Sequence, residues 1–424
     1  MGKIPHIKHL SKLFNLRSLQ FAFLLVTGQA ATIFVGIFLA RTLSIHDYSI
    51  YVIVMMLSAL SVSLSSGGIN IGFTSSVGKA WPEKSQVSGL LSLAIKMRNK
   101  QAAVVFPLIL LFAFFLLYRN EVNIFSCLLL LTLIAVNLYL DINTRLFERI
   151  LSFRRMLTDI QKINFFSSIL RLASILLCFT FGLLTSETAY IITILALLLK
   201  MNLTKQQNTD YYNNDSTYSK EQEAEFSSIN KRQYPSTIFD CIKGQIAVGI
   251  LAVSANSELV AAYGALSKVT QIYLPILILL QTFAIAHFAQ IQQRIIANLS
   301  FWLVLSLLPG LFLVSISSYY PHLILNVLGP NYTGFSKELL LMSLSVTFTG
   351  FTNVFYTLVI NRGWNKYVSI QIPLVAIWLC YCFVFLDFSI LTNIIFMNAL
   401  IPLGLLIATF VSLIDGIRSR KMVK

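Results

Sequence analysis

Twelve long apolar blocks, rather than any single motif, constrain what this chain can fold into. A helix that spans a membrane needs about 20 predominantly apolar residues, and such blocks recur along most of the 424 residues. They are rich in Leu, Ile, Ala and Phe and lack the alternating ten-residue pattern of an outer-membrane barrel. Only 12% of the residues are charged, against about 25% in soluble domains. The sequence therefore predicts an all-α polytopic membrane protein and excludes a water-soluble globular domain.

The predicted spans fall into two sets of six. We place them at 19–40, 48–69, 102–118, 122–141, 160–183 and 187–200, and at 236–256, 259–289, 299–319, 337–360, 367–386 and 389–414. The eighth span is long and contains Pro275, which predicts a kink. The second is followed by Gly67 and Gly68, where we expect a bend, with the helix continuing to Val77. Residues 4–16 suit a short helix on the membrane surface.

The basic residues indicate the orientation of the spans. With the N-terminus in the cytoplasm, 25 of the 32 lysines and arginines fall in segments on the cytoplasmic side. Three fall on the opposite side, namely Arg41, Arg119 and Lys337. Cytoplasmic segments carry such an excess of positive charge, so we expect both termini in the cytoplasm. This distribution, rather than a nucleic-acid partner, accounts for the net charge of +15.

A polar segment at 201–235 separates the two sets of spans. It has many Asn, Gln, Ser and acidic residues and no apolar periodicity, so we predict a flexible cytoplasmic linker. The expected domains are a six-helix bundle over 1–200, the linker over 201–235, and a second six-helix bundle over 236–424. An even number of spans per half makes the halves parallel repeats. Two such bundles around a central cavity are typical of a transporter.

Four basic residues fall inside predicted spans, where burying a cation costs a few kcal/mol. They are Lys162, Arg171, Lys243 and Lys268. Lys268 lies deepest, and intramembrane charge by default marks a transport pathway, although a structural ion pair would also explain it. Lys243 follows Asp240 by one turn and could pair with it, and Lys162 is close enough to a helix end to reach the interface. Arg41 ends the first span, either at a cavity mouth or as an interfacial anchor.

Several function classes lack the residues that they need. The sequence contains no Walker A pattern and no glycine-rich dinucleotide loop. The five cysteines lie within apolar blocks, without metal-ligand spacing to histidine. No long outer loop offers room for a catalytic site. We therefore expect no enzyme activity, no metal and no cofactor.

Three segments resemble motifs of one transporter family. Residues 38–51 read FLARTLSIHDYSIY, which resembles the signature at the junction of helices 1 and 2 of bacterial O-antigen and polysaccharide flippases, with Ser49 where glycine is usual. Residues 328–332 read LGPNY and residues 361–366 read NRGWNK; they resemble motifs that precede helices 10 and 11. This family belongs to the superfamily of multidrug, oligosaccharidyl-lipid and polysaccharide exporters.

The resemblance implies translocation of undecaprenyl-diphosphate-linked oligosaccharides across the bacterial inner membrane. Such proteins are expected to alternate access between their two halves, driven by an ion gradient. A diphosphate is anionic, so the predicted substrate-binding residues are Lys268, Arg171, Lys243 and Arg41, chosen on charge and depth. Besides the lipid bilayer, a polysaccharide polymerase and a chain-length regulator are the protein partners to test.

Three other functions stay open at this point. A multidrug extruder of the same superfamily would usually carry membrane-embedded acids, whereas the charges within spans here are positive. A membrane-embedded O-antigen polymerase would need a large outer loop. A scaffold for polysaccharide assembly would need neither.

Overall fold

The computed structural model describes residues 16–212, 218–254, 256–290 and 294–422, and the regular elements found there are helices. Twelve of these helical segments are long and apolar enough to cross a membrane, which confirms the predicted number of spans and the all-α fold class. The predicted surface helix at 4–16 lies almost wholly outside the described residues. Contacts divide the chain into two compact units, and their boundaries cross three helices rather than falling in loops.

Unit 1 comprises residues 1–35 and 54–241. Its complete helices are α4 (Ile69–Ala80), α5 (Lys84–Arg119), α6 (Ile124–Phe153), α7 (Leu157–Thr180), α8 (Ser186–Gln206) and the short η1 (Thr209–Tyr211). It also holds the first part of α2 (Leu16–Thr42), the second part of α3 (Ile45–Ser66) and the first part of α9 (Lys220–Ser254).

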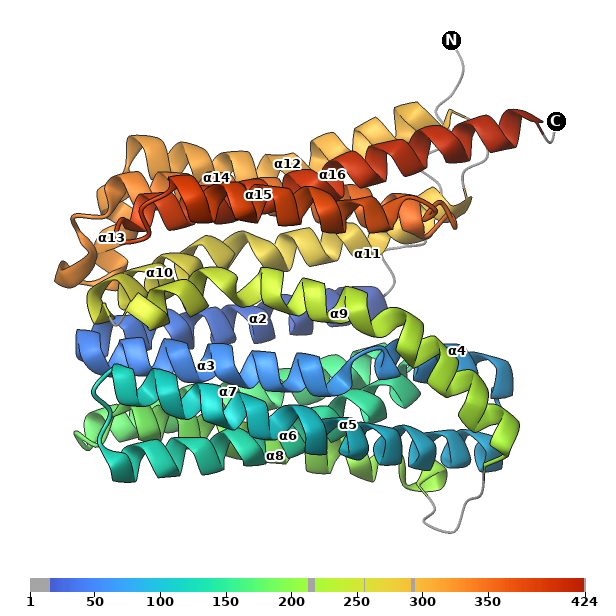
Figure 1. Ribbon diagram of the computed structural model, residues 1–424, viewed down its shortest axis with the longest axis horizontal. Coiled ribbons are helices and arrows are strands. Elements are labelled where there is room, and N and C mark those ends of the chain that lie inside the picture. The colour runs from blue at the N-terminus through green and yellow to red at the C-terminus, as the bar shows by residue number, and fades with distance from the viewer. Residues whose placement is uncertain (1–15, 213–217, 255, 291–293, 423–424) are drawn as a thin grey trace. The chain divides into compact units, whose positions relative to one another are not determined.

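Unit 2 comprises residues 36–53 and 242–424. It contains α10 (Ser257–Thr270), η2 (Gln271–Tyr273), α11 (Leu274–Gln290), α12 (Ile295–Tyr319), α13 (Pro321–Leu328), η3 (Pro330–Tyr332), α14 (Ser336–Ile360), η4 (Val368–Ile370), α15 (Gln371–Phe385) and α16 (Leu391–Met422). The last turns of α2, the first turns of α3 and the end of α9 complete it. In Figure 1 the long helices of each unit run lengthwise beside one another.

Two predicted irregularities lie where the sequence placed them. The eighth span is interrupted between α10 and α11 by one turn of 3₁₀ helix at Gln271–Tyr273, because Pro275 offers no N–H to continue the α-helical hydrogen bonds. The second span ends at Ser66, and the chain turns at Gly67, which has a positive φ of 46°, before α4 begins. The residues up to Val77, which we expected to continue the second span as one bent helix, therefore belong to a separate helix, α4.

The predicted linker differs in structure from the expectation. Residues 201–206 extend α8, and residues 220–235 are the first turns of α9. Phe226 and Tyr211 are buried in a cluster with α4, α5 and α6 that includes Phe73 and Leu90. The helix forms because tertiary packing stabilises it, and two apolar side chains in a polar segment leave no visible periodicity. The domain boundaries at 200 and 236 stay a prediction.

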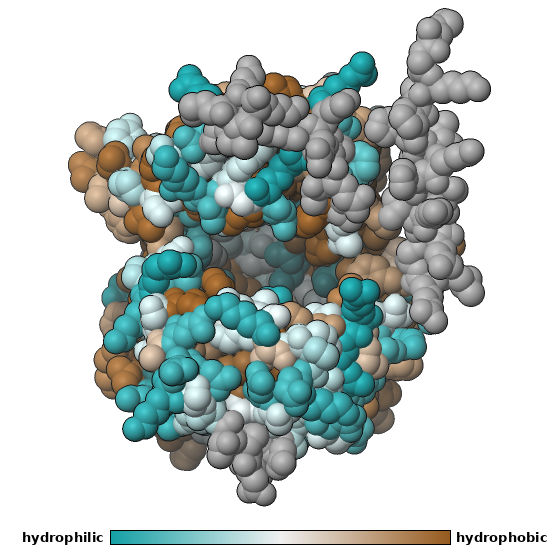
Figure 2. Space-filling view, turned by 90° about the vertical axis from the view of Figure 1, so that its right-hand side faces the viewer, coloured by the Kyte–Doolittle hydropathy of each residue, from teal (hydrophilic) through white to brown (hydrophobic). Residues whose placement is uncertain are grey.

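The ends of α4, α5 and α9 extend past the other helices of unit 1 (Figure 1). Figure 2 looks onto this end of the molecule, and hydrophilic side chains predominate there, with hydrophobic residues along the flanks. Both α5, with 36 residues, and α9, with 35 residues, exceed the roughly 20 residues that cross the hydrocarbon core. Their polar first turns therefore belong outside the core.

Candidate functional site

Lys268 lies within a membrane-spanning helix of unit 2 and packs against α2. It is half-buried on α10, 11 residues after Ser257, which is about 17 Å along a helix axis. A Cβ atom placed on Gly36 would lie 2.7 Å from Lys268 Cδ and 2.9 Å from Cγ. Gly36 thus leaves the space that the aliphatic stem of Lys268 occupies. Lys268 thus lies well inside the span, which runs from Ser257 to Ile285, and its role in a pathway stays a prediction.

Arg41 is anchored to the backbone of its own unit. Its Nη1 donates hydrogen bonds to the carbonyl oxygens of Asn326, at 3.1 Å, and Val327, at 3.3 Å. These carbonyls lie at the C-terminal end of α13, where the helix dipole is negative and favours a cation. Arg41 therefore ties the end of α2 to the segment directly before Gly329.

The two family-like motifs at 38–51 and 328–332 come together in unit 2. Arg41 Cγ lies 3.5 Å from the position of a Cβ on Gly329, and Tyr48 and Tyr332 are both buried. Burial raises the pKa of Tyr332 to about 12. Ser49, within the first of these motifs, is buried and donates its hydroxyl hydrogen to the His46 carbonyl at 2.7 Å.

The remaining candidates lie on two different helices. Lys243 is half-buried on α9, in the part that belongs to unit 2, three residues after Asp240. Arg171 is half-buried near the middle of α7 in unit 1. The structure therefore places Arg41, Lys243 and Lys268 in one compact unit and Arg171 in the other. Their role in substrate binding stays a prediction.

Other charges in the spans of unit 1 form ion pairs. Arg145 contacts Asp141 at 2.8 Å, and Lys200 contacts Glu148 at 2.9 Å. Lys162, at the beginning of α7, contacts Asp159 at 3.1 Å. These partners explain why the three basic side chains are tolerated near the membrane without a ligand.

Arg98 is a buried cation that the sequence reasoning missed. Its side chain is fully buried on α5, where Nη1 donates to the Ile142 carbonyl at 2.6 Å and Nη2 donates to Asn143 Oδ1 at 3.1 Å. By composition it belongs to a polar segment before the third span. The sequence did contain a pattern that predicts burial, because Leu91, Ala94 and Arg98 share one face of a helix. In the structure Leu91 and Ala94 are buried on that face. Arg98 thereby fixes α5 against α6.

The part of the chain that the structure describes offers no metal site. No three His, Cys, Asp or Glu side chains gather there in an arrangement that could hold an ion. His287 instead accepts a hydrogen bond from Trp302 Nε1 at 3.0 Å. Its role is packing between α11 and α12.

Comparisons with known proteins identify the fold. No protein-family model and no curated protein matches the chain. Among solved structures, lipid II flippase MurJ in an inward closed conformation is similar with a TM-score of 0.69 and 12% identity, covering 93% of this chain and 87% of that one. An inward-facing multidrug resistance MATE family transporter of the MOP superfamily is similar with a TM-score of 0.59 and 11% identity, and the match covers 97% of each chain. A mutant of the Vibrio cholerae MATE transporter VcmN is similar with a TM-score of 0.57 and 16% identity, and the match covers 97% of this chain and 98% of that one. The chain therefore has the fold of these transporters.

Proposed function

We propose that this protein is a flippase that moves undecaprenyl-diphosphate-linked O-antigen or polysaccharide repeat units across the bacterial inner membrane. The observation that carries the proposal is a lysine, Lys268, held deep in a span of a chain that shares its fold with a lipid flippase. Transport would proceed by alternating access, driven by an ion gradient. Both termini would lie in the cytoplasm, in agreement with the distribution of basic residues.

The chemistry of the substrate explains why cations are needed. Transfer of a diphosphate into a low-dielectric core is costly unless opposite charges compensate it. Lys268 would supply one such charge, with Arg171 and Lys243 as further contacts along the path. The isoprenoid chain can stay in the bilayer while the polar sugars cross.

Arg41 can take part without giving up its structural contacts. A guanidinium group carries five N–H donors in a planar fork, and both carbonyl bonds of Arg41 use Nη1. Its other N–H groups could therefore meet an anion while Nη1 stays bound to Asn326 and Val327. Arg41 would act at the end of the path that lies near α13.

A multidrug extruder is the second candidate, because MATE transporters share the fold over nearly the whole chain. The charges favour the first candidate. Asp141 and Glu148 also lie within a described span, but they form ion pairs with Arg145 and Lys200. A basic side chain such as Lys268 suits an anionic lipid, whereas organic cations would need an acid in that position.

The decisive experiment is deletion of the gene followed by complementation. We expect the deletion strain to lose surface polysaccharide and to accumulate undecaprenyl-diphosphate-linked oligosaccharide. The wild-type gene should reverse both changes. Lys268→Met should fail to restore surface polysaccharide at an equal protein level in the membrane, and Lys268→Arg should restore part of it. Lys337→Met, which removes an exposed lysine of the same unit, serves as the matched control.

Drug susceptibility of the same strains separates the two candidates. Normal polysaccharide in the deletion strain together with increased sensitivity to cationic drugs would favour the extruder. Normal polysaccharide with Lys268→Met would remove Lys268 from the proposed path. Loss of a polysaccharide polymerase or chain-length regulator should leave translocation of single repeat units intact.

A further inference from the structure

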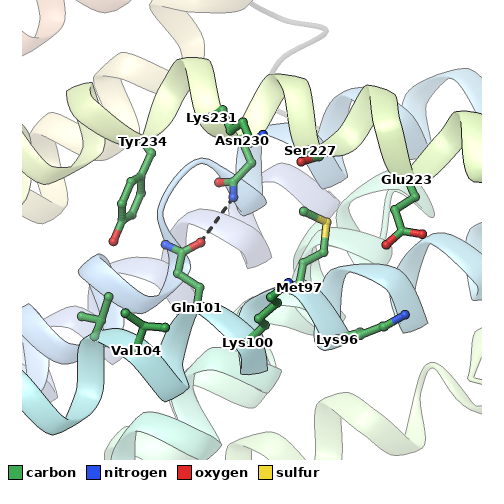
Figure 3. Close-up of a pocket in the computed structure, with 11 residues that line it drawn as sticks. Lys96, Met97, Lys100, Gln101, Val104, Glu223, Ser227, Asn230, Lys231 and Tyr234 are labelled. Atoms are coloured by element: carbon green, nitrogen blue, oxygen red, sulfur yellow. Dashed lines mark hydrogen bonds between the residues drawn. The ribbon is translucent and has the colours of Figure 1, made fainter.

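A pocket of about 570 Å³ lies between α5 and the first turns of α9, entirely within unit 1. Figure 3 shows the side chains of the two helices facing one another across it. From α5 come Lys96, Lys100 and Gln101, and from α9 come Glu223, Asn230 and Lys231. None of the predicted substrate-binding residues lines this pocket.

Hydrogen bonds and two glycines fix the shape of the pocket. Gln101 Nε2 donates to the Leu64 carbonyl at 2.9 Å, and Asn230 Nδ2 donates to Gln101 Oε1 at 3.3 Å (Figure 3). A Cβ on Gly67 would lie 2.4 Å from Gln101 Nε2, and one on Gly68 would lie 2.8 Å from the Asn230 carbonyl oxygen. The glycine turn between α3 and α4 thus lets α9 and Gln101 approach closely.

The pocket carries a positive charge. Lys96, Lys100 and Lys231 line it against a single acid, Glu223, which faces Lys96 (Figure 3). Lys96 donates to the Tyr218 hydroxyl at 2.8 Å. Lys100 and Lys231 are exposed, and no partner for either amine lies within the described parts of the chain. Ser227, Asn230 and Tyr234 add polar groups. Two lysine amines beside neutral hydrogen-bonding groups form a site for a phosphate.

Both helices place this charge at the level of lipid headgroups. Arg119 is the last residue of α5 and marks the far end of the span. Lys96 and Lys100 lie about 35 and 29 Å from it along the helix axis, whereas Val104 lies about 23 Å from it. Along α9, Lys231 and Tyr234 lie about 35 and 30 Å from Ser254. The hydrocarbon core is about 30 Å thick, so the lysines fall at its edge. In Figure 3 Val104 and Tyr234 lie at the opposite end of the pocket from Lys96 and Glu223.

We propose that this pocket binds the phosphate group of a lipid, with the lipid chain leaving past Val104 into the bilayer. Two classes of bacterial membrane lipid combine such a phosphate with a net negative charge, the anionic phospholipids and the isoprenoid phosphates, whereas phosphatidylcholine also carries a cation. The site does not rest on the proposed flippase function, because a phospholipid site would serve a drug transporter equally well. The pocket belongs to unit 1, whereas Lys268 belongs to unit 2.

The test is lipid binding to purified, delipidated protein in detergent, followed by native mass spectrometry. The probes are phosphatidylglycerol, undecaprenyl monophosphate, phosphatidylcholine and inorganic phosphate. We expect the first two to bind more tightly than phosphatidylcholine, and the tighter of the two identifies the source of the phosphate. Inorganic phosphate that binds as tightly as either lipid would overturn the assignment of a lipid.

Two variants locate the binding in the pocket. The double change Lys100→Gln with Lys231→Gln removes two charged hydrogen bonds and should weaken the lipid phosphates about tenfold or more. Lys205→Gln with Lys220→Gln removes the same charge from exposed positions of unit 1 outside the pocket, and should leave affinity within about twofold. Equal losses in both double variants would mean unspecific attraction and would overturn the proposal.

A third variant keeps the charge and fills the space. Ser227→Phe places a ring in the pocket and should reduce binding as strongly as the lysine changes. Unchanged binding by monodisperse Ser227→Phe protein would place the lipid elsewhere. Transport of the proposed substrate by the same variants is a separate readout, so failure of one proposal does not decide the other.

Discussion

Arg41 Nη1 donates a hydrogen bond to the Asn326 carbonyl oxygen at a distance of 3.1 Å. This bond joins two segments that are 285 residues apart in sequence and that each lie at or beside a family-like motif. It holds the junction of α2 and α3 to the C-terminal end of α13 within unit 2. The last turns of α2 and the first turns of α3 belong to unit 2, whereas most of these two helices belongs to unit 1.

We expect Arg41→Gln to loosen α13. Hydrogen bonds to a charged group contribute about 1.5–3 kcal/mol, and the exposure of Arg41 reduces that figure, so we expect about 1 kcal/mol. Hydrogen–deuterium exchange of residues 321–332 should become several-fold faster. Arg119→Gln, at the exposed C-terminal end of α5, should leave that exchange unchanged. Equal exchange in the wild type and Arg41→Gln would show that the bond has no stabilising role.

We expect Gly36→Leu to displace Lys268 and to reduce transport as Lys268→Met does. The new side chain would occupy the position that the lysine stem fills, 2.7 Å from a Cβ at residue 36. If both changes act through one amine, their effects are not additive. Transport assays on the two single variants and the double variant measure this coupling. Fully additive losses would mean that Gly36 acts independently of Lys268.

We expect Arg98→Ala to destabilise unit 1 by about 3–5 kcal/mol, because it leaves a cavity and removes the bonds to Ile142 and Asn143. Arg98→Met should cost less, since an apolar chain of similar length refills the space. Thermal unfolding followed by size-exclusion fluorescence measures the difference. Asn99→Ala, at the adjacent exposed position, is the matched control, and an equal loss in that control would contradict the assignment.

We expect Gly68→Val to separate α9 from the turn between α3 and α4. The added Cβ would lie 2.8 Å from the Asn230 carbonyl oxygen. A backbone carbonyl cannot move aside by changing rotamer, as a flexible side chain can, so α9 itself must shift. Hydrogen exchange over residues 220–235 should rise. At Gly78 the nearest atom to an added Cβ is 3.8 Å away, so Gly78→Ala should leave the exchange unchanged. A similar rise in both variants would point to a general loss of stability.

The candidate site was predictable only in part. Lys268 stands out in the sequence because a lysine among apolar residues is costly in a membrane, and the structure places it in the last turn of α10, within the span that continues to Ile285. Arg98 was missed because the surrounding lysines gave its segment the composition of a loop. The partner of Arg41 was equally hidden, since a backbone carbonyl carries no mark in the sequence.

The sequence by itself determined the number of spans, their helical character and the break before Pro275. These follow from local physics, because lipid offers the backbone no hydrogen-bond partner and each span must satisfy its own groups. Only the tertiary structure decided that residues 220–235 form a helix, that Arg98 is buried, and that the ends of α2 and α3 belong with unit 2. Those features depend on contacts between residues far apart in sequence, which no local pattern of hydropathy or charge records.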